Sequence, residues 1–135
     1  MNHLLKDSDQ VAADIKTANK VIPLHISTKA LCRGDIYNNE EQKLGKLHDL
    51  IVVLPAGEIT FAIISCGGFW GIGEKLLAVP WEVLTFNYKL KRFSLPISID
   101  RLSEAPSFEP GNWPDMQDER WLRKVRSFYI MDNAA

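Results

Sequence analysis

Cysteine is scarce in this chain of 135 residues, which holds only Cys32 and Cys66. Two cysteines cannot supply the dense disulfide framework of a small secreted domain, and their spacing matches no zinc motif. We therefore expect neither a disulfide scaffold nor a cysteine-based metal site. Both residues are interpreted as small thiols in the protein interior.

An excess of charge of either sign is also missing, because 16 basic residues face 17 acidic ones and the formal net charge is −1. Binding to nucleic acid or to an anionic membrane begins with clustered Lys and Arg, so neither partner is expected. No apolar run approaches the roughly 18 residues of a membrane-spanning helix. Residues 1–8 turn polar too early for the apolar core of a signal peptide, which favours a cytoplasmic protein.

Phosphate-binding motifs are incomplete in the glycine-rich segment 67–73. Glu74 stands before Lys75, and Leu76 replaces the hydroxyl group that would bind magnesium in a phosphate-binding loop. The dinucleotide fingerprint fails at the same place, because Leu76 stands where its last glycine should be. The segment is therefore expected to connect two strands rather than to bind a phosphate.

Catalytic and metal-ligating arrangements are missing as well. Ser65 does not lie in a nucleophile elbow, and Cys66 has no histidine nearby in the sequence. His3, His25 and His48 are too far apart in the sequence to form a ligand motif. We therefore expect no enzyme activity, no cofactor, no metal site and no small-molecule substrate.

What the chain does contain is an ordinary globular composition, with 46% hydrophobic and 24% charged residues. Its length fits one domain with its own core. The polar residues 1–20 are interpreted as a flexible N-terminal arm. Residues 21–96 carry the strand signals of a small antiparallel six-stranded β-barrel, and residues 97–135 form a C-terminal extension that packs on it.

The strand signals alternate with turn signals along this barrel segment. The predicted strands cover residues 21–24, 30–37, 44–54, 59–66, 74–80, 85–88 and 92–95. Pro23 places the first of these at an edge or outside the sheet. Turns are predicted at residues 38–41, 55–58 and 89–91, and residues 81–84 form a helical turn or a strand corner.

The C-terminal extension contains a short helical turn at residues 98–102, an irregular proline-containing segment at 105–114, and a helix. Phe108 and Trp113 are expected to be buried against the barrel. Asp118 is the predicted helix cap, and Trp121, Leu122, Val125, Phe128 and Tyr129 then recur at helical spacing.

Several of these pieces together resemble the PRC-barrel family, which is named for the photosynthetic reaction centre H subunit. They are residues 34–38, 43–47, 49–50, 62, 65, 67–75 and 79–81, with residues 105–106, 113–115 and 121 in the extension. The resemblance covers roughly residues 28–130, and the segment from Gly67 to Trp81 is its most specific part. Trp70 and Cys66 depart from the usual pattern, in which smaller aliphatic and apolar residues stand there.

The resemblance implies a small barrel of about six antiparallel strands that acts as a part of larger assemblies. One relative belongs to an electron-transfer complex, and another is a ribosome-maturation factor that contacts a ribosomal protein. Residues with a structural role are expected to be Gly67, Gly68, Gly71, Gly73, Pro80 and Trp81, the glycines because a wide hairpin needs positive backbone angles.

The candidate interaction surface consists of an aromatic hairpin tip and a basic helix face. Its residues are Phe69, Trp70, Ile72, Arg120, Arg123 and Lys124. The aromatic residues either fold back on the barrel or stay exposed and contact a partner. The leading hypothesis is a non-enzymatic protein-interaction module. This chain is expected to form homodimers, because open sheet edges must be covered or paired, and any other protein partner is unknown. The alternatives are an RNA or ribosome-assembly accessory protein and a small-molecule or lipid sensor.

Overall fold

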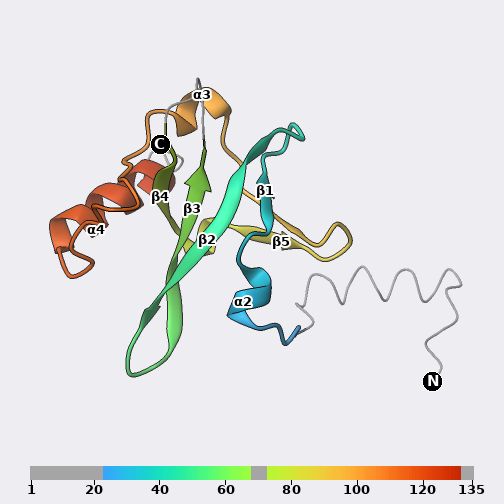
Figure 1. The fold of residues 1–135 in the computed structure, drawn as a ribbon, viewed down its shortest axis with the longest axis horizontal. Coiled ribbons are helices and arrows are strands. Elements are labelled where there is room, and N and C mark those ends of the chain that lie inside the picture. Colours follow the sequence, from blue (N-terminus) through green and yellow to red (C-terminus); the bar gives the residue numbers. More distant parts are fainter. Residues whose placement is uncertain (1–22, 68–72, 132–135) are drawn as a thin grey trace, which may run out of the picture.

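The computed structural model describes residues 23–67 and 73–131 of the chain (Figure 1). The predictions for residues 1–20, 21, 22 and 68–72 lie outside this part. Its strands are β1 (Asp35–Tyr37), β2 (Lys43–Val53), β3 (Glu58–Cys66), β4 (Lys75–Pro80), β5 (Thr85–Asn87) and β6 (Arg92–Ser94). Its helical segments are α2 (Thr28–Leu31), the 3₁₀ turn η2 (Trp81–Val83), α3 (Ile99–Leu102), α4 (Glu119–Arg126) and the π-helical turn η3 (Ser127–Met131).

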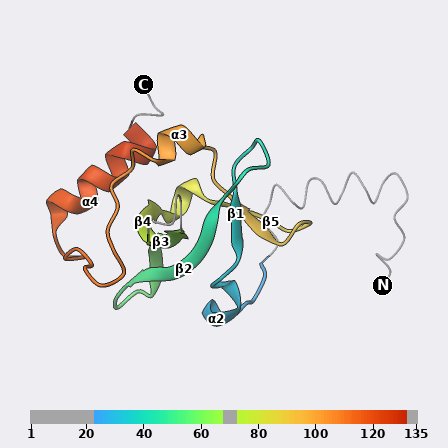
Figure 2. The ribbon, with the colours of Figure 1, turned by 45° about the horizontal axis from the view of Figure 1, so that its top comes forward.

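The six strands form one mixed sheet in the order β4-β3-β2-β1-β6-β5. Within residues 23–67 and 73–131, β4 and β5 are the two end strands of this sheet and do not pair with each other, so it does not close into a barrel. Figures 1 and 2 show β5 on one side of the long β2–β3 pair and α4 on the other. The predicted number of strands is confirmed, whereas the predicted barrel is an open, curved sheet.

One strand pair also corrects the antiparallel prediction. β1 and β6 run parallel, with Ile36 opposite Phe93 and Tyr37 opposite Ser94. The other four pairings are antiparallel. Turn residues fix the direction of strands that follow each other along the chain. β1 and β6 are far apart in the sequence, so no local turn determines their relative direction.

The backbones of β2 and β3 approach each other closely at Gly45, where the sheet bends. A Cβ atom at Gly45 would lie 2.3 Å from the backbone oxygen of Ser65, so only glycine allows this approach. The register between β2 and β3 also shifts between Leu47 and Asp49 and again between Ile51 and Val52. Such bulges increase the local twist of a strand pair, which accounts for the curvature of the sheet.

The core lies between the curved sheet and the C-terminal extension. Its buried side chains come from β1 to β4 and β6, from Leu95 and α3, and from the final helical segments; they include Ile36, Leu47, Ile64, Leu76, Phe93, Leu102, Ala105, Val125 and Tyr129. The extension therefore belongs to the same core as the strands. Asp118 caps α4 by accepting a hydrogen bond from the Arg120 amide, as the sequence predicts.

The segment between α3 and α4 is held on the outer edge of β4. The Leu76 amide donates to the Phe108 carbonyl at 2.8 Å, and the Phe108 amide donates back to the Leu76 carbonyl at 2.9 Å. This confirms that the irregular segment packs on the sheet. The prediction for Trp113 is wrong, because its side chain is 36% exposed and contacts the rings of His48 and Phe108 at the surface.

The N-terminal strand predictions are only partly correct. Residues 23–27 form no strand, and the first two residues of the strand predicted at 30–37 belong instead to α2, which covers residues 28–31. The Ser27 hydroxyl caps α2 by accepting from the Ala30 amide at 3.1 Å, and Arg33 then adopts a positive φ of 78°. The cap outweighs the β-like run from Ala30 to Cys32. None of the helices in this part of the chain is long and apolar enough to cross a membrane.

Candidate interaction site

The distal half of the β2–β3 hairpin extends beyond the rest of the sheet (Figure 1). On one side, β1 pairs with β2 only up to Lys46, and two further backbone hydrogen bonds join Leu47 to Arg33 and Gly34. On the other side, β4 pairs with β3 only from Phe61 onward. Among the strands that the structure describes, residues 48–53 therefore pair with β3 alone, and residues 58–60 pair with β2 alone.

The tip of this hairpin is apolar and exposed. Val52 is 45% exposed, Val53 46% and Leu54 78%. Successive side chains of a strand point to opposite faces of the sheet. Because both neighbouring valines are exposed, neither face of the hairpin is covered here. We call residues 48–60 the hairpin arm.

The turn at the end of the arm follows from its sequence. Gly57 has a φ of +83°, a conformation that glycine adopts readily, and its amide donates to the Val53 carbonyl at 2.8 Å. The predicted turn at residues 55–58 is thus present one residue earlier, at residues 54–57, and Glu58 already belongs to β3. The turn closes the hairpin and fixes Leu54 at its end.

The glycine-rich segment connects β3 and β4, whose ends Cys66 and Lys75 pair across the sheet. It therefore joins two antiparallel strands, as the sequence predicts. Gly67 and Gly73 have no positive φ, and a Cβ atom at either would meet nothing within 4 Å, so the predicted need for positive angles is wrong at these two positions. Gly68, Phe69, Trp70, Gly71 and Ile72 lie outside the described residues.

Pro80 and Trp81 connect the end of β4 to the strand β5. Pro80 is buried, and the Trp81 ring lies 5.7 Å from the Phe93 ring in an edge-on contact. The turn η2 that starts at Trp81 redirects the chain across the end of the sheet. These two residues thus lie where the chain passes from β4, at one end of the sheet, to β5, at the other end.

The predicted basic face is present on α4, on the side away from the core. Arg120, Arg123 and Lys124 are exposed. Arg126 on the same helix instead forms an ion pair with Glu82 of η2, which lowers the pKa of that carboxyl group against the opposing effect of burial. The structure places this basic face and the hairpin arm on different elements and does not bring them together in one site.

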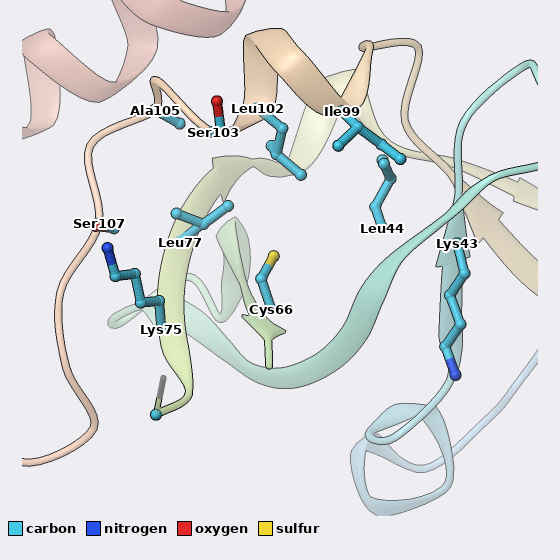
Figure 3. A pocket seen from close by; sticks show the side chains of 11 residues that line it. Lys43, Leu44, Cys66, Lys75, Leu77, Ile99, Leu102, Ser103, Ala105 and Ser107 are labelled. Atoms are coloured by element: carbon cyan, nitrogen blue, oxygen red, sulfur yellow. The ribbon is translucent and has the colours of Figure 1, made fainter. Parts of the chain in front are cut away.

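A cavity of about 320 Å³ lies beneath α3 and the segment that follows it (Figure 3). Cys66 contributes its thiol to this cavity, and burial raises the pKa of the thiol to about 11. Both cysteines are half-buried free thiols, so the interpretation as fully interior residues is wrong. In residues 23–67 and 73–131, no group of three His, Cys, Asp or Glu residues could hold a metal ion.

Neither the hairpin arm nor the cavity was singled out by sequence reasoning. One signal for the arm was present: the predicted strand at residues 44–54 is longer than the strands predicted beside it, so part of it must lack a neighbour. Its last five residues are also all apolar, which ends the alternation typical of a strand with one buried face. The cavity depends on contacts between distant segments and has no local signal.

Comparison with known protein families agrees with this architecture. The family model of the PRC-barrel domain matches residues 26–102, which is more than half of the chain. The chain belongs to the PRC-barrel domain family. No curated protein matches it. The match ends at the last residue of α3. The rest of the extension, including α4, lies outside the PRC-barrel match although it contributes Val125 and Tyr129 to the core.

Proposed function

We propose that this PRC-barrel protein is a non-catalytic interaction module that forms dimers through its hairpin arm. The observation that carries the proposal is the exposure of Val52, Val53 and Leu54 on a two-stranded ribbon whose outer edges have no strand partner among the described residues. Exposed strand edges and contiguous apolar side chains favour association with another chain.

A second copy is the occupant that fits this surface best. The arm presents both an unpaired edge of β2 and apolar side chains on its two faces, so antiparallel pairing of two arms would satisfy backbone groups and bury Val52 and Val53 together. Such a contact uses the same surface on both subunits and closes with twofold symmetry. It occupies the β2 edge of both arms, so a third copy cannot join through the same contact.

The test measures mass in solution by light scattering across a range of protein concentrations. The double variant Val53→Lys with Leu54→Lys places two charges on the arm. We expect wild type to dimerise. The dissociation constant of the variant dimer should be at least tenfold higher, which corresponds to a loss of about 1.4 kcal/mol in the free energy of dimerisation.

The matched control changes two other exposed leucines in the same way. Leu24 is 48% and Leu90 51% exposed, and neither lies on the arm. The variant Leu24→Lys with Leu90→Lys should dimerise like wild type. Equal effects of both double variants, or a monomeric wild type at all concentrations, would refute self-association through the arm.

A further inference from the structure

The cavity beneath α3 is lined by elements from both halves of the chain and is partly open to solvent. Leu44 of β2, Cys66 of β3 and Leu77 of β4 line one side, and Ile99 and Leu102 of α3 lie opposite them (Figure 3). Ala105 and Ser107 of the following segment complete the wall. Its volume of about 320 Å³ is at the lower end of the range of small-molecule sites, roughly 300–1,000 Å³.

The interior of this cavity is apolar. Leu44, Leu77, Leu102 and Ala105 are all core residues, and the Cys66 sulfur points into the space between them (Figure 3). Because burial keeps the Cys66 thiol protonated at neutral pH, it adds no charge to the wall. An apolar space of this kind gives water few hydrogen-bond partners and favours a hydrocarbon group.

Among the residues of the cavity wall that the structure describes, cationic and hydroxyl groups occur only at the border. The Lys75 side chain extends toward Ser107 (Figure 3), and no described acidic side chain forms an ion pair with it. Glu74, its neighbour in the sequence, accepts a hydrogen bond from the Ser65 hydroxyl instead. Lys43, the other lysine at the border, is paired with Asp35 at 3.2 Å.

We propose that this cavity binds a small amphipathic carboxylate, with its hydrocarbon chain between β4 and α3 and its carboxylate at Lys75. One uncommitted ammonium group with one nearby hydroxyl, that of Ser107, matches a single negative charge. The Ser103 hydroxyl already donates to the Asp100 carbonyl at 2.6 Å and does not contribute to this recognition. The site is separate from the hairpin arm and does not depend on the proposed dimer.

Octanoate is the probe for the test, with octanol and octylamine as probes of the same chain length. Calorimetric titration should give the order octanoate, octanol, octylamine from the tightest to the weakest. Lys75→Glu should weaken octanoate binding by about fivefold or more and leave octanol binding within about twofold, because it reverses the charge of a partly exposed group. Lys29→Glu on α2, an exposed lysine away from the cavity, is the matched control and should bind octanoate like wild type.

A second readout locates the ligand without depending on Lys75. Octanoate should slow the reaction of Cys66 with dithiodipyridine at least threefold and leave that of Cys32 unchanged, because only Cys66 lines the cavity. Ser107→Trp, at an exposed border position, should block both binding and protection. Equal protection of both cysteines, absence of binding, or undiminished binding by Ser107→Trp would overturn the proposal. The arm variant Val53→Lys with Leu54→Lys should keep full octanoate binding, so loss of binding in that variant would also overturn it.

Discussion

The two ends of the β2–β3 strand pair have opposite surroundings. At the proximal end, Ile63 and Ile64 of β3 are both fully buried although they point to opposite faces of the sheet. At the distal end, Val52 and Val53 of β2 are both exposed by nearly half of their surface. The same two strands thus form a core at one end and an uncovered ribbon at the other.

The difference comes from what the rest of the chain places beside the strands. β4 pairs with the proximal end, Phe108 covers the outer edge of β4, and α4 and η3 add Val125 and Tyr129 to the core. Burial of each large aliphatic side chain stabilises the fold by roughly 1.5–3 kcal/mol. The distal end receives no such cover from the described residues, so a second chain can supply it. Four predictions test this contrast between the two ends.

The largest effect is expected from a charge at the covered end. Val125→Asp places a carboxylate at a fully buried position of α4 and should destabilise the protein by more than about 3 kcal/mol in urea unfolding. Arg120→Asp is the control on the same helix. It is exposed in the first turn, where an acidic residue is favourable, so its effect should stay within about 0.5 kcal/mol. Similar values for both variants would mean that α4 does not cover the sheet.

A smaller loss of stability is expected at the bend between the two ends. Gly45→Ala forces a Cβ atom against the Ser65 backbone oxygen, and relieving this clash should cost about 1–3 kcal/mol. Gly111→Ala is the control, because a Cβ atom there meets nothing within 4 Å and φ is not positive. Chemical denaturation of both variants gives the comparison. If Gly45→Ala were as stable as wild type, β2 and β3 would have room for a side chain at position 45.

A weaker, pH-dependent effect on stability is expected from Asp35, which lies on β1 and pairs with Lys46 of β2. The hydrogen bond from Lys46 at 2.8 Å, together with Lys43, lowers the pKa of the Asp35 carboxyl group below its ordinary value of 3.8. The ionised form therefore stabilises the fold above this ordinary pKa, and the contribution disappears as the pH falls through the lowered one.

Asp35→Asn should accordingly reduce stability at pH 7 by less than about 1 kcal/mol, because the ion pairs are partly exposed. The difference from wild type should shrink as the pH falls below 4 and then vanish. Thermal unfolding measured across this pH range provides the comparison. A difference that persists at the lowest pH would assign the effect to something other than the charge.

The smallest effect on monomer stability is expected at the uncovered end. Leu54→Lys changes a side chain that is 78% exposed, so the stability of the monomer should stay within about 0.5 kcal/mol of wild type. The measurement is urea unfolding at a concentration low enough to keep the protein monomeric. A large loss would show that Leu54 packs within its own chain.

Much of the strand pattern could be predicted because it is local. The turn predicted at residues 55–58, the strand predicted from 59 to 66 and the cap at Asp118 depend on neighbouring residues. All three are present, the turn and the start of the strand one residue earlier than predicted. The parallel pairing of β1 with β6 and the cover of β4 by Phe108 depend on segments far apart in the sequence. No periodicity or turn residue encodes such contacts.

The candidate sites show the same division. Exposure of Arg120, Arg123 and Lys124 could be predicted from helical spacing, because the opposite side of α4 carries the apolar residues. The hairpin arm could be recognised only once the lengths of its neighbouring strands were known. The α2 cap at Ser27 was overlooked because an apolar run of three residues fits both helix and strand.

Hydrogen exchange measured at several protein concentrations tests the role of the hairpin arm most directly. If two arms pair, the backbone amides of residues 48–53 that point away from β3 should exchange at least tenfold more slowly at high concentration than at low concentration. Amides at residues 61–66 should be protected equally at both concentrations, because β2 and β4 already flank them. Exchange at residues 48–53 that is independent of concentration would contradict the account.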